Sequence, residues 1–346
     1  MRIGYVSTFE HDWNTESETA KWMERMGHEV DLWQYNTFVK PQFLKVQHQY
    51  NIVMAALPQS VSVDFWERVE VPKVARYYDI VRGWENRESI YIPPLKHFDL
   101  VISTDGYEDW YSHYGIDRVY LPHGFDPDKY NPVPAVDEYR CDVAFIGHVY
   151  TPRRKSLLNG LGKFGLRVYG EDNSCWGLKY SQICSSAKIV VGDNAVNSIP
   201  GYWSDRLYLS MGCGAFLLYP YVPGIEGQFR DGEHLVLYKD EKDLHKKIRH
   251  YLKHKEERWE IAWNGWEHAH QNHTIPHRVQ AIEEILRSAL SPIQIEPAVS
   301  GSSRMNSIRS SEHLSSQSAT KPKDRNSGNA RPRPHRSLRQ TRLTIT

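Results

Sequence analysis

Polar residues in the stretch 187–226 have the types and spacing of a site that binds phosphate and hydroxyl groups. Asp193 and Asn194 follow a short apolar run, and Asp205-Arg206 opens the next helical segment. Arginine makes charge-assisted, often bidentate bonds to phosphate, whereas carboxylates and amides bind hydroxyls. Each acid or amide also has a structural explanation, since Asp and Asn form Asx turns and Asp205 is a good N-cap. Arg206 is therefore the strongest phosphate-binding candidate of the four.

A second group of candidates lies around two other predicted strand ends. Gly147 and His148 end an apolar run, a place where backbone N–H groups can approach a pyrophosphate, although a plain βα turn explains them equally well. Arg153 and Arg154 follow and have the charge to neutralise a diphosphate, but a solvated basic turn is the commoner origin of such a pair. Glu226 follows Pro-Gly, where it either binds the hydroxyls of a sugar or is an exposed turn residue.

The elements that must position these residues form repeated strand–helix–strand units. Residues 188–191 and 215–219 are typical of buried parallel strands, and the helix between them, 205–211, ends at a glycine. Ligands of such units lie at the carboxyl ends of the strands. Further strands are predicted at 1–7, 29–33, 50–56, 71–77, 99–103, 118–121, 141–146, 166–169 and 233–238. Further helices are predicted at 17–26, 65–69, 108–114, 180–186, 241–253, 256–270 and 276–290, and another follows the basic residues 153–155 and ends at about Gly162.

This alternation predicts an α/β protein with two Rossmann-like domains that face each other across a cleft. The proline-rich segment 122–139 is the expected linker, so we expect an N-terminal domain with linker at 1–137 and a second domain at 138–291. A length of 346 residues is sufficient for two cores, and 40% hydrophobic and 25% charged residues are ordinary for a soluble protein.

The segment 292–346 differs in composition from the rest of the chain. It is rich in Ser, Pro and Asn, and from residue 301 onward its Lys and Arg residues far outnumber its two acids, Glu312 and Asp324. Such a segment cannot bury enough apolar surface to fold, so we expect a disordered basic tail. The tail is either a solvated extension or a contact to a polyanion such as nucleic acid, and a nucleic-acid scaffold led by it is a further functional hypothesis.

Several function classes and locations are disfavoured. No GxGxxG follows the first predicted strand, which argues against an NAD enzyme. The DPD motif at 126–128 resembles a metal-binding DxD, but its prolines predict a turn, and the histidines lack an HExxH or Cys partner. We therefore expect no metal site and no cofactor.

The sequence also predicts a location. The four cysteines have no CxxC spacing, the first residues contain no signal-type apolar region, and no apolar run approaches the length of a membrane span. We therefore expect a cytoplasmic protein without a transmembrane segment.

Taken together, the motifs resemble the CgeB-like glycosyltransferases of the GT-B fold (group 1), including phage-encoded members. The strongest part of the resemblance lies in DVAFIG at 142–147 with Arg153-Arg154, AKIVV at 187–191, YWSDR at 202–206, CGAF at 213–216, PGIE at 223–226, DGEH at 231–234 and the segment 259–278. A looser part lies in YYD at 77–79, DLV at 99–101, TDG at 104–106 and LPHGFD at 121–126. The resemblance covers roughly residues 70–290.

The resemblance implies a metal-independent, hexosyltransferase-type enzyme that takes a sugar from a nucleotide-sugar donor held by the second domain. It adds Tyr202 and Ser204 to the donor-binding candidates named above. The acceptor is left open as a glycan, a protein or modified DNA. Many relatives carry a Glu for the ribose hydroxyls on the helix after Arg206, where this chain has Leu209. That departure motivates an alternative, a degenerate GT-B protein that binds nucleotide sugar or glycan without turnover.

An inverting transfer needs a base near the acceptor hydroxyl, whereas a retaining transfer needs none. His11, Asp12, Asp79 and Asp105 all lie at predicted strand ends of the first domain. Each is individually explained as a structural residue, and the resemblance favours Asp79 and Asp105 as the catalytic candidates.

Overall fold

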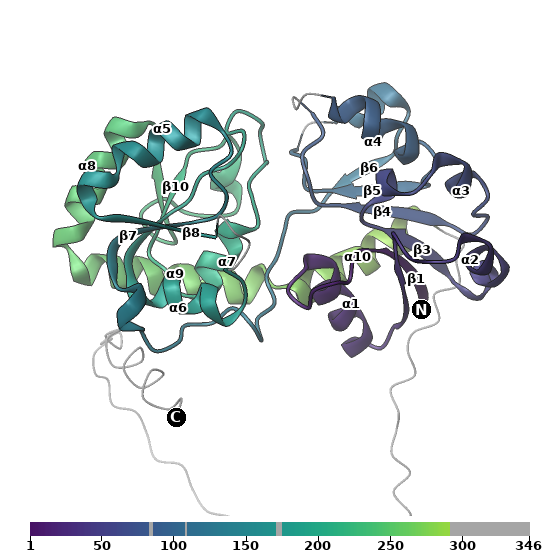
Figure 1. Cartoon of the computed structure of the whole chain (residues 1–346), viewed down its shortest axis with the longest axis horizontal. Coiled ribbons are helices and arrows are strands. Elements are labelled where there is room, and N and C mark those ends of the chain that lie inside the picture. Colours follow the sequence, from purple (N-terminus) through teal and green to yellow (C-terminus); the bar gives the residue numbers. More distant parts are fainter. Residues whose placement is uncertain (83–85, 108, 171–174, 291–346) are drawn as a thin grey trace, which may run out of the picture.

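The structure is a computed structural model that describes residues 1–82, 86–107, 109–170 and 175–290. It contains two α/β domains, side by side in Figure 1. The first is built on a six-stranded parallel sheet in the order β2-β1-β3-β4-β5-β6. Its strands are β1 (Arg2–Ser7), β2 (Glu29–Gln34), β3 (Ile52–Ala55), β4 (Lys73–Tyr77), β5 (Leu100–Ser103) and β6 (Arg118–Tyr120). Its helices are α1 (Thr15–Arg25), α2 (Lys40–Val46), α3 (Val63–Glu67) and α4 (Arg87–Leu95).

The second domain has a five-stranded parallel sheet in the order β11-β10-β9-β7-β8. Its strands are β7 (Cys141–Ile146), β8 (Leu166–Tyr169), β9 (Ala187–Val191), β10 (Leu217–Pro220) and β11 (Val236–Tyr238). Its helices are α5 (Pro152–Gly160), α6 (Leu178–Ser186), α7 (Arg206–Gly212), α8 (Glu241–Lys253) and α9 (Lys255–Asn272). The strand order reverses between β1 and β3 in the first sheet and between β7 and β9 in the second, and such reversals create crevices at the carboxyl ends of the strands.

The last helix, α10 (Ile275–Ala289), returns to the first domain. Its buried face packs in one core cluster with β1 and α1, and Figure 1 shows it next to α1. The sequence analysis places residues 138–291 in the second domain. Because the apolar residues of α10 bury themselves on the first sheet, we propose that the domain boundary lies before this helix. The chain crosses between the domains twice, and a backbone bridge between Phe125 and Thr274 joins the two crossing segments.

The domains also contact each other through loops beside this crossing. The backbone N–H of Tyr107 donates to the carbonyl of Pro200 at 2.8 Å, and the Tyr120 hydroxyl donates to the carbonyl of Gly201 at 2.8 Å. Gly201 has a φ of +77°, and a Cβ there would stand 2.6 Å from the ring of Tyr107. A side chain at this position would force the two loops apart.

Asp126, the first acid of the DPD motif, forms the predicted turn. Its Oδ1 accepts the backbone N–H of Asp128 at 3.0 Å and the indole N–H of Trp22 at 2.9 Å, and Lys21 pairs with its Oδ2 at 2.9 Å. The carboxylate is fully buried by these contacts. It therefore ties the linker to α1.

The structure confirms the α/β, two-domain architecture and most of the predicted strands. The sequence analysis missed α2 and α4; the latter contains two prolines, Pro93 and Pro94. The predicted helix 108–114 is a short 3₁₀ turn over Tyr111–Tyr114, and residue 108 lies outside the described residues. The predicted tail at 292–346 also lies outside them. Over the part of the chain that the structure describes, no helix has both the length and the apolar character needed to cross a bilayer.

Candidate functional site

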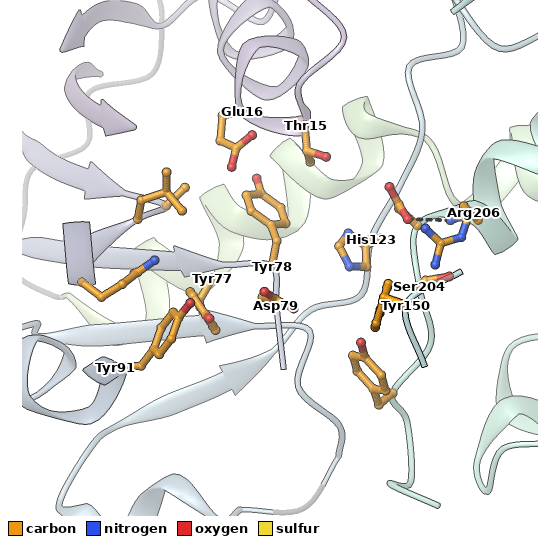
Figure 2. A pocket seen from close by; sticks show the side chains of 15 residues that line it. Thr15, Glu16, Tyr77, Tyr78, Asp79, Tyr91, His123, Tyr150, Ser204 and Arg206 are labelled. Carbon is orange, nitrogen blue, oxygen red and sulfur yellow. Dashed lines mark hydrogen bonds between the residues drawn. The ribbon is translucent and has the colours of Figure 1, made fainter. Parts of the chain in front are cut away.

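Two cavities meet at Arg206. The larger, of about 360 Å³, is the cleft between the domains. Its first-domain wall comes from the start of α1, the ends of β3 and β4, and His123, and its second-domain wall from Tyr150 and the segment that leads into α7. Figure 2 shows Glu16, Tyr78 and His123 on one side and Arg206 on the other. The smaller cavity, of about 70 Å³, lies at the ends of β7 and β8. Arg206 lines both.

Arg206 begins α7, and its guanidinium lies against the backbone of Gly147. A Cβ at Gly147 would stand 3.1 Å from the Nε of Arg206, and the φ of +142° at Gly147 is one that favours glycine. Among the residues that the structure describes, none accepts a hydrogen bond from this guanidinium. Burial opposes its charge, but the neighbouring Asp205 carboxylate raises the pKa of Arg206 overall. The site therefore holds a permanent cation that is available to an anionic ligand.

Asp193 forms ion pairs with both Arg153 and Arg154. Asp193 is buried and receives a bidentate pair from Arg153 at 2.9 Å for each bond, and Arg154 donates to its Oδ2 at 3.0 Å. Arg154 is itself buried and also donates to the carbonyls of Asp193 and His148. A buried carboxylate requires such compensation. These three predicted donor-binding residues thus brace α5 against the loop after β9, and the buried Arg154 is fully engaged there, whereas the Arg153 side chain is 48% exposed.

Asn194 is a buried residue that shapes the same loop. Its side-chain oxygen accepts the backbone N–H of Ser204 at 2.9 Å and the hydroxyl of Tyr219, and its amide donates to Asn197 at 3.1 Å. These bonds fix Ser204 at the edge of the cleft. Asn194 is thus placed to position a cleft residue without lining the cleft.

The structure brings most of the remaining predicted donor-binding residues to the two cavities. Tyr202, Ser204 and Asp205 line the cleft, while Gly147 and His148 line the small cavity. Glu226 lies apart from them. It is exposed in the short turn Ile225–Gly227, where its Oε1 accepts the hydroxyl of Tyr221 at 3.5 Å, and it lines neither cavity.

The two predicted catalytic acids have different environments. Asp79 lines the cleft, but its side chain is about half exposed (51%) and its carboxylate is paired with Arg87 at 2.6 Å. Asp105 lines neither cavity and is buried. One of its oxygens accepts the backbone N–H of Val81 at 3.0 Å and the hydroxyl of Tyr111 at 2.9 Å, and burial raises its pKa to about 6. Asp105 holds the loop that follows Asp79.

Sequence reasoning missed three cleft residues, Glu16, His123 and Tyr150. Glu16 lies in the first turn of α1, the helix that follows β1, and burial raises its pKa to about 7. His123 stacks on Tyr78 at 5.8 Å, and burial lowers its pKa to about 4. The Nδ1 atom of His123 is buried and has no hydrogen-bond partner among the residues that the structure describes. Glu16 follows the strand at which the sheet order reverses, and His123 lies within the LPHGFD motif, so the signals were present in the sequence.

Leu209, the position at which the resemblance described above implies an acid, belongs to the apolar core. It is 4% exposed and packs in the cluster that surrounds α7. A carboxylate at this position would therefore be buried among apolar side chains rather than solvated.

Known proteins resemble this chain at the level of a family and of the fold. Residues 153–284 match the family described as Glycosyl transferase-like. No curated protein sequence matches the chain at a significant level. Among solved structures, the chain is similar to Anabaena HepE in complex with UDP-glucose (TM-score 0.63, 13% identity, 83% of this chain and 100% of that one). It is also similar to a sucrose-phosphate synthase from Thermosynechococcus elongatus (0.59, 12%, 84% and 99%). A third similar structure is an α-glucosyltransferase in complex with UDP-glucose and DNA containing an abasic site (0.60, 10%, 83% and 99%). These likenesses confirm the GT-B fold predicted above.

Proposed function

We propose that this chain is a glycosyltransferase that moves a sugar from a nucleotide-sugar donor to an acceptor hydroxyl. The observation that carries the proposal is the position of Arg206 between a small, mainly apolar cavity and a larger polar cleft. A nucleotide sugar has the same order of parts: a flat base, a charged diphosphate and a polyhydroxyl sugar. In this arrangement the base enters the small cavity, the diphosphate meets Arg206, and the sugar enters the cleft.

The reaction breaks the bond between the sugar and the diphosphate, so negative charge develops on the leaving phosphate oxygen. A fixed cation in a site shielded from water stabilises that charge more in the transition state than in the ground state. Arg206 supplies it, since its guanidinium is charged and mostly surrounded by protein, and no side chain in the described ranges accepts a hydrogen bond from it. We propose that this arginine does the work that a divalent metal does in other transferases.

On the acceptor side, we propose that Asp79 and Glu16 contact the incoming hydroxyl group. Both line the first-domain wall of the cleft, opposite Arg206. Asp105 then acts as a positioning residue, because it holds the backbone of Val81 and Arg82 next to Asp79. His123 completes this wall as a neutral imidazole.

The comparisons support the proposal at the level of domains. The matched family spans residues 153–284, which include both arginines of α5 and Arg206. Similar structures hold UDP-glucose, and one of them also holds DNA. We propose the CgeB-like subfamily and a hexose donor as the finer assignment. A glycan, a protein or modified DNA is the acceptor in this proposal.

A donor screen tests the proposal. Purified full-length protein is incubated with UDP-, GDP- and TDP-sugars, and release of the nucleotide is measured. We expect one donor class to be turned over, with loss of at least about 100-fold in kcat/KM for Arg206→Ala, as for removal of other transition-state donors. Arg249→Ala, an exposed arginine on α8, is the matched control and should leave turnover unchanged. No turnover of any donor would contradict the proposal.

Leu209 supports a second candidate function, binding of a nucleotide sugar or glycan without turnover. The buried, apolar environment of Leu209 leaves the ribose without the acid that many relatives carry. This candidate predicts saturable donor binding by calorimetry together with no release of nucleotide over many hours. Measurable turnover by the unmodified chain would exclude it.

A further inference from the structure

Three aromatic rings form a continuous stack that joins the two domains. His11 and Trp13, from the loop after β1, stack with ring centroids 4.6 Å apart and an interplanar angle of 9°. Trp13 in turn stacks on Trp176 at 4.6 Å and 2°. Trp176 belongs to the segment between β8 and α6 of the second domain. The stack is therefore a contact across the domain interface, made by rings that lie more than 160 residues apart in the sequence.

Trp176 is also a wall of the small cavity beside Arg206. Trp13 does not line that cavity itself, so it acts on the cavity only through the ring of Trp176 on which it stacks. The indole N–H of Trp176 is buried and has no hydrogen-bond partner in the described part of the chain. A buried donor without a partner is costly, and a ligand carbonyl would relieve that cost.

The other walls make the cavity narrow. Gly170 follows β8 with a φ of +88°, and a Cβ there would stand 3.3 Å from the backbone nitrogen of Gly147 and 3.5 Å from the Cβ of Cys175. The cavity has a volume of about 70 Å³ and is lined mainly by apolar groups, among them Ile146 and Tyr180. Its size suits one planar ring better than the two fused rings of a purine.

We propose that Trp13 is a positioning residue for the donor: it fixes Trp176 so that the small cavity is a slot for the single-ring base of a pyrimidine nucleotide. This inference rests on the proposed function, because it assigns the base of the same donor. The first domain thereby contributes to recognition of a ligand that the second domain holds. An offset aromatic pair contributes enough free energy for its loss to weaken binding roughly 2- to 12-fold.

The test measures binding of UDP and GDP to full-length protein by calorimetry. We expect the unmodified chain to bind UDP more tightly than GDP. Trp13→Ala should weaken UDP binding roughly 2- to 12-fold and reduce the preference over GDP, while Trp13→Phe should restore most of both. Trp176→Ala should have a larger effect, since it removes the wall itself. Trp263→Ala, on α9 and away from both cavities, is the control and should bind UDP normally.

The outcomes separate this inference from the proposed function. If UDP binds the unmodified chain and Trp13→Ala binds it equally well with an unchanged thermal midpoint, the positioning role is overturned and the proposed function stands. Equal binding of UDP and GDP overturns the pyrimidine slot alone. Failure of every nucleotide to bind overturns the proposed function and this inference with it. A KM for the donor that rises in Trp13→Ala with little change in kcat further supports positioning.

Discussion

The guanidinium of Arg206 packs directly on the backbone of Gly147, so that a Cβ at Gly147 would stand 3.1 Å from Nε and 3.3 Å from Cζ. Gly147 directly follows β7, and Arg206 begins α7, on the far side of β9 in the sequence. In this position Arg206 lines both cavities. The absence of a side chain at residue 147 is thus part of how the cation is placed.

Gly147→Ala should therefore impair donor binding without touching any charge. The added methyl group must push the guanidinium away, and the φ of +142° is unfavourable for alanine. We expect donor affinity to fall at least about 10-fold, the effect that roughly 1.4 kcal/mol of misplaced binding energy produces. Calorimetry with UDP checks this, and Gly162→Ala, a glycine with open space around it, is the control. Unchanged affinity in Gly147→Ala would show that the contact is incidental.

Asp193→Asn should mainly lower the stability of the folded chain rather than weaken ligand binding directly. The substitution leaves the buried Arg154 cation without its carboxylate, and breaking such a pair costs about 3–5 kcal/mol of unfolding free energy. Arg153→Ala should cost less, since its side chain is 48% exposed. Urea unfolding measures both. If both variants lost the same small amount of unfolding free energy, the ion pairs of Asp193 would not stabilise the contact between α5 and the loop after β9.

Glu16→Gln should change the pH dependence of stability. Burial raises the pKa of folded Glu16 from 4.5 to about 7, so between these values the folded state binds more protons than the unfolded state. Stability of the unmodified chain therefore falls as pH rises from about 4.5 to 7, and the glutamine, which does not ionise, removes that fall.

Thermal midpoints at pH 5 and pH 8 test this linkage. At each pH, the midpoint of the unmodified chain is subtracted from that of Glu16→Gln. This difference should be more positive at pH 8 than at pH 5. Glu24→Gln, on the exposed side of α1, should show no such change. A difference between Glu16→Gln and the unmodified chain that is the same at both pH values would contradict the buried environment of Glu16.

Leu209→Glu should destabilise the chain, because it places a carboxylate in the apolar cluster around α7. Leu209→Met conserves volume and should cost less than about 1.5 kcal/mol. If the position faces the ribose of a bound donor, saturating UDP should raise the melting midpoint of Leu209→Glu more than that of Leu209→Met. Equal shifts with UDP would place residue 209 outside the donor site.

Much of the framework follows from local patterns in the sequence. The apolar run 141–146 is the strand β7 to the residue, since buried parallel strands show as continuous hydrophobic segments. The predicted strand 166–169 also matches β8, although β8 is an edge strand that is only partly buried. Gly147 was recognisable because it follows the first of these runs, and Arg206 because it opens a helical segment. The two helices that the sequence analysis missed, α2 and α4, lack a clear helical period, and prolines lie within α4.

The sequence alone determined the two α/β units, the order of their strands along the chain and the strand ends that we propose as the ligand site. Only the tertiary structure decided which polar groups remain available there. Asp193 and Arg154 come from elements about 40 residues apart, and their pairing uses up charges that the sequence presents as ligands. Glu16, His123 and Arg206 meet only because the domains face each other, and Trp13 reaches Trp176 for the same reason. Local periodicity reports which face of an element is buried, whereas charge compensation and a shared cavity depend on contacts between distant segments.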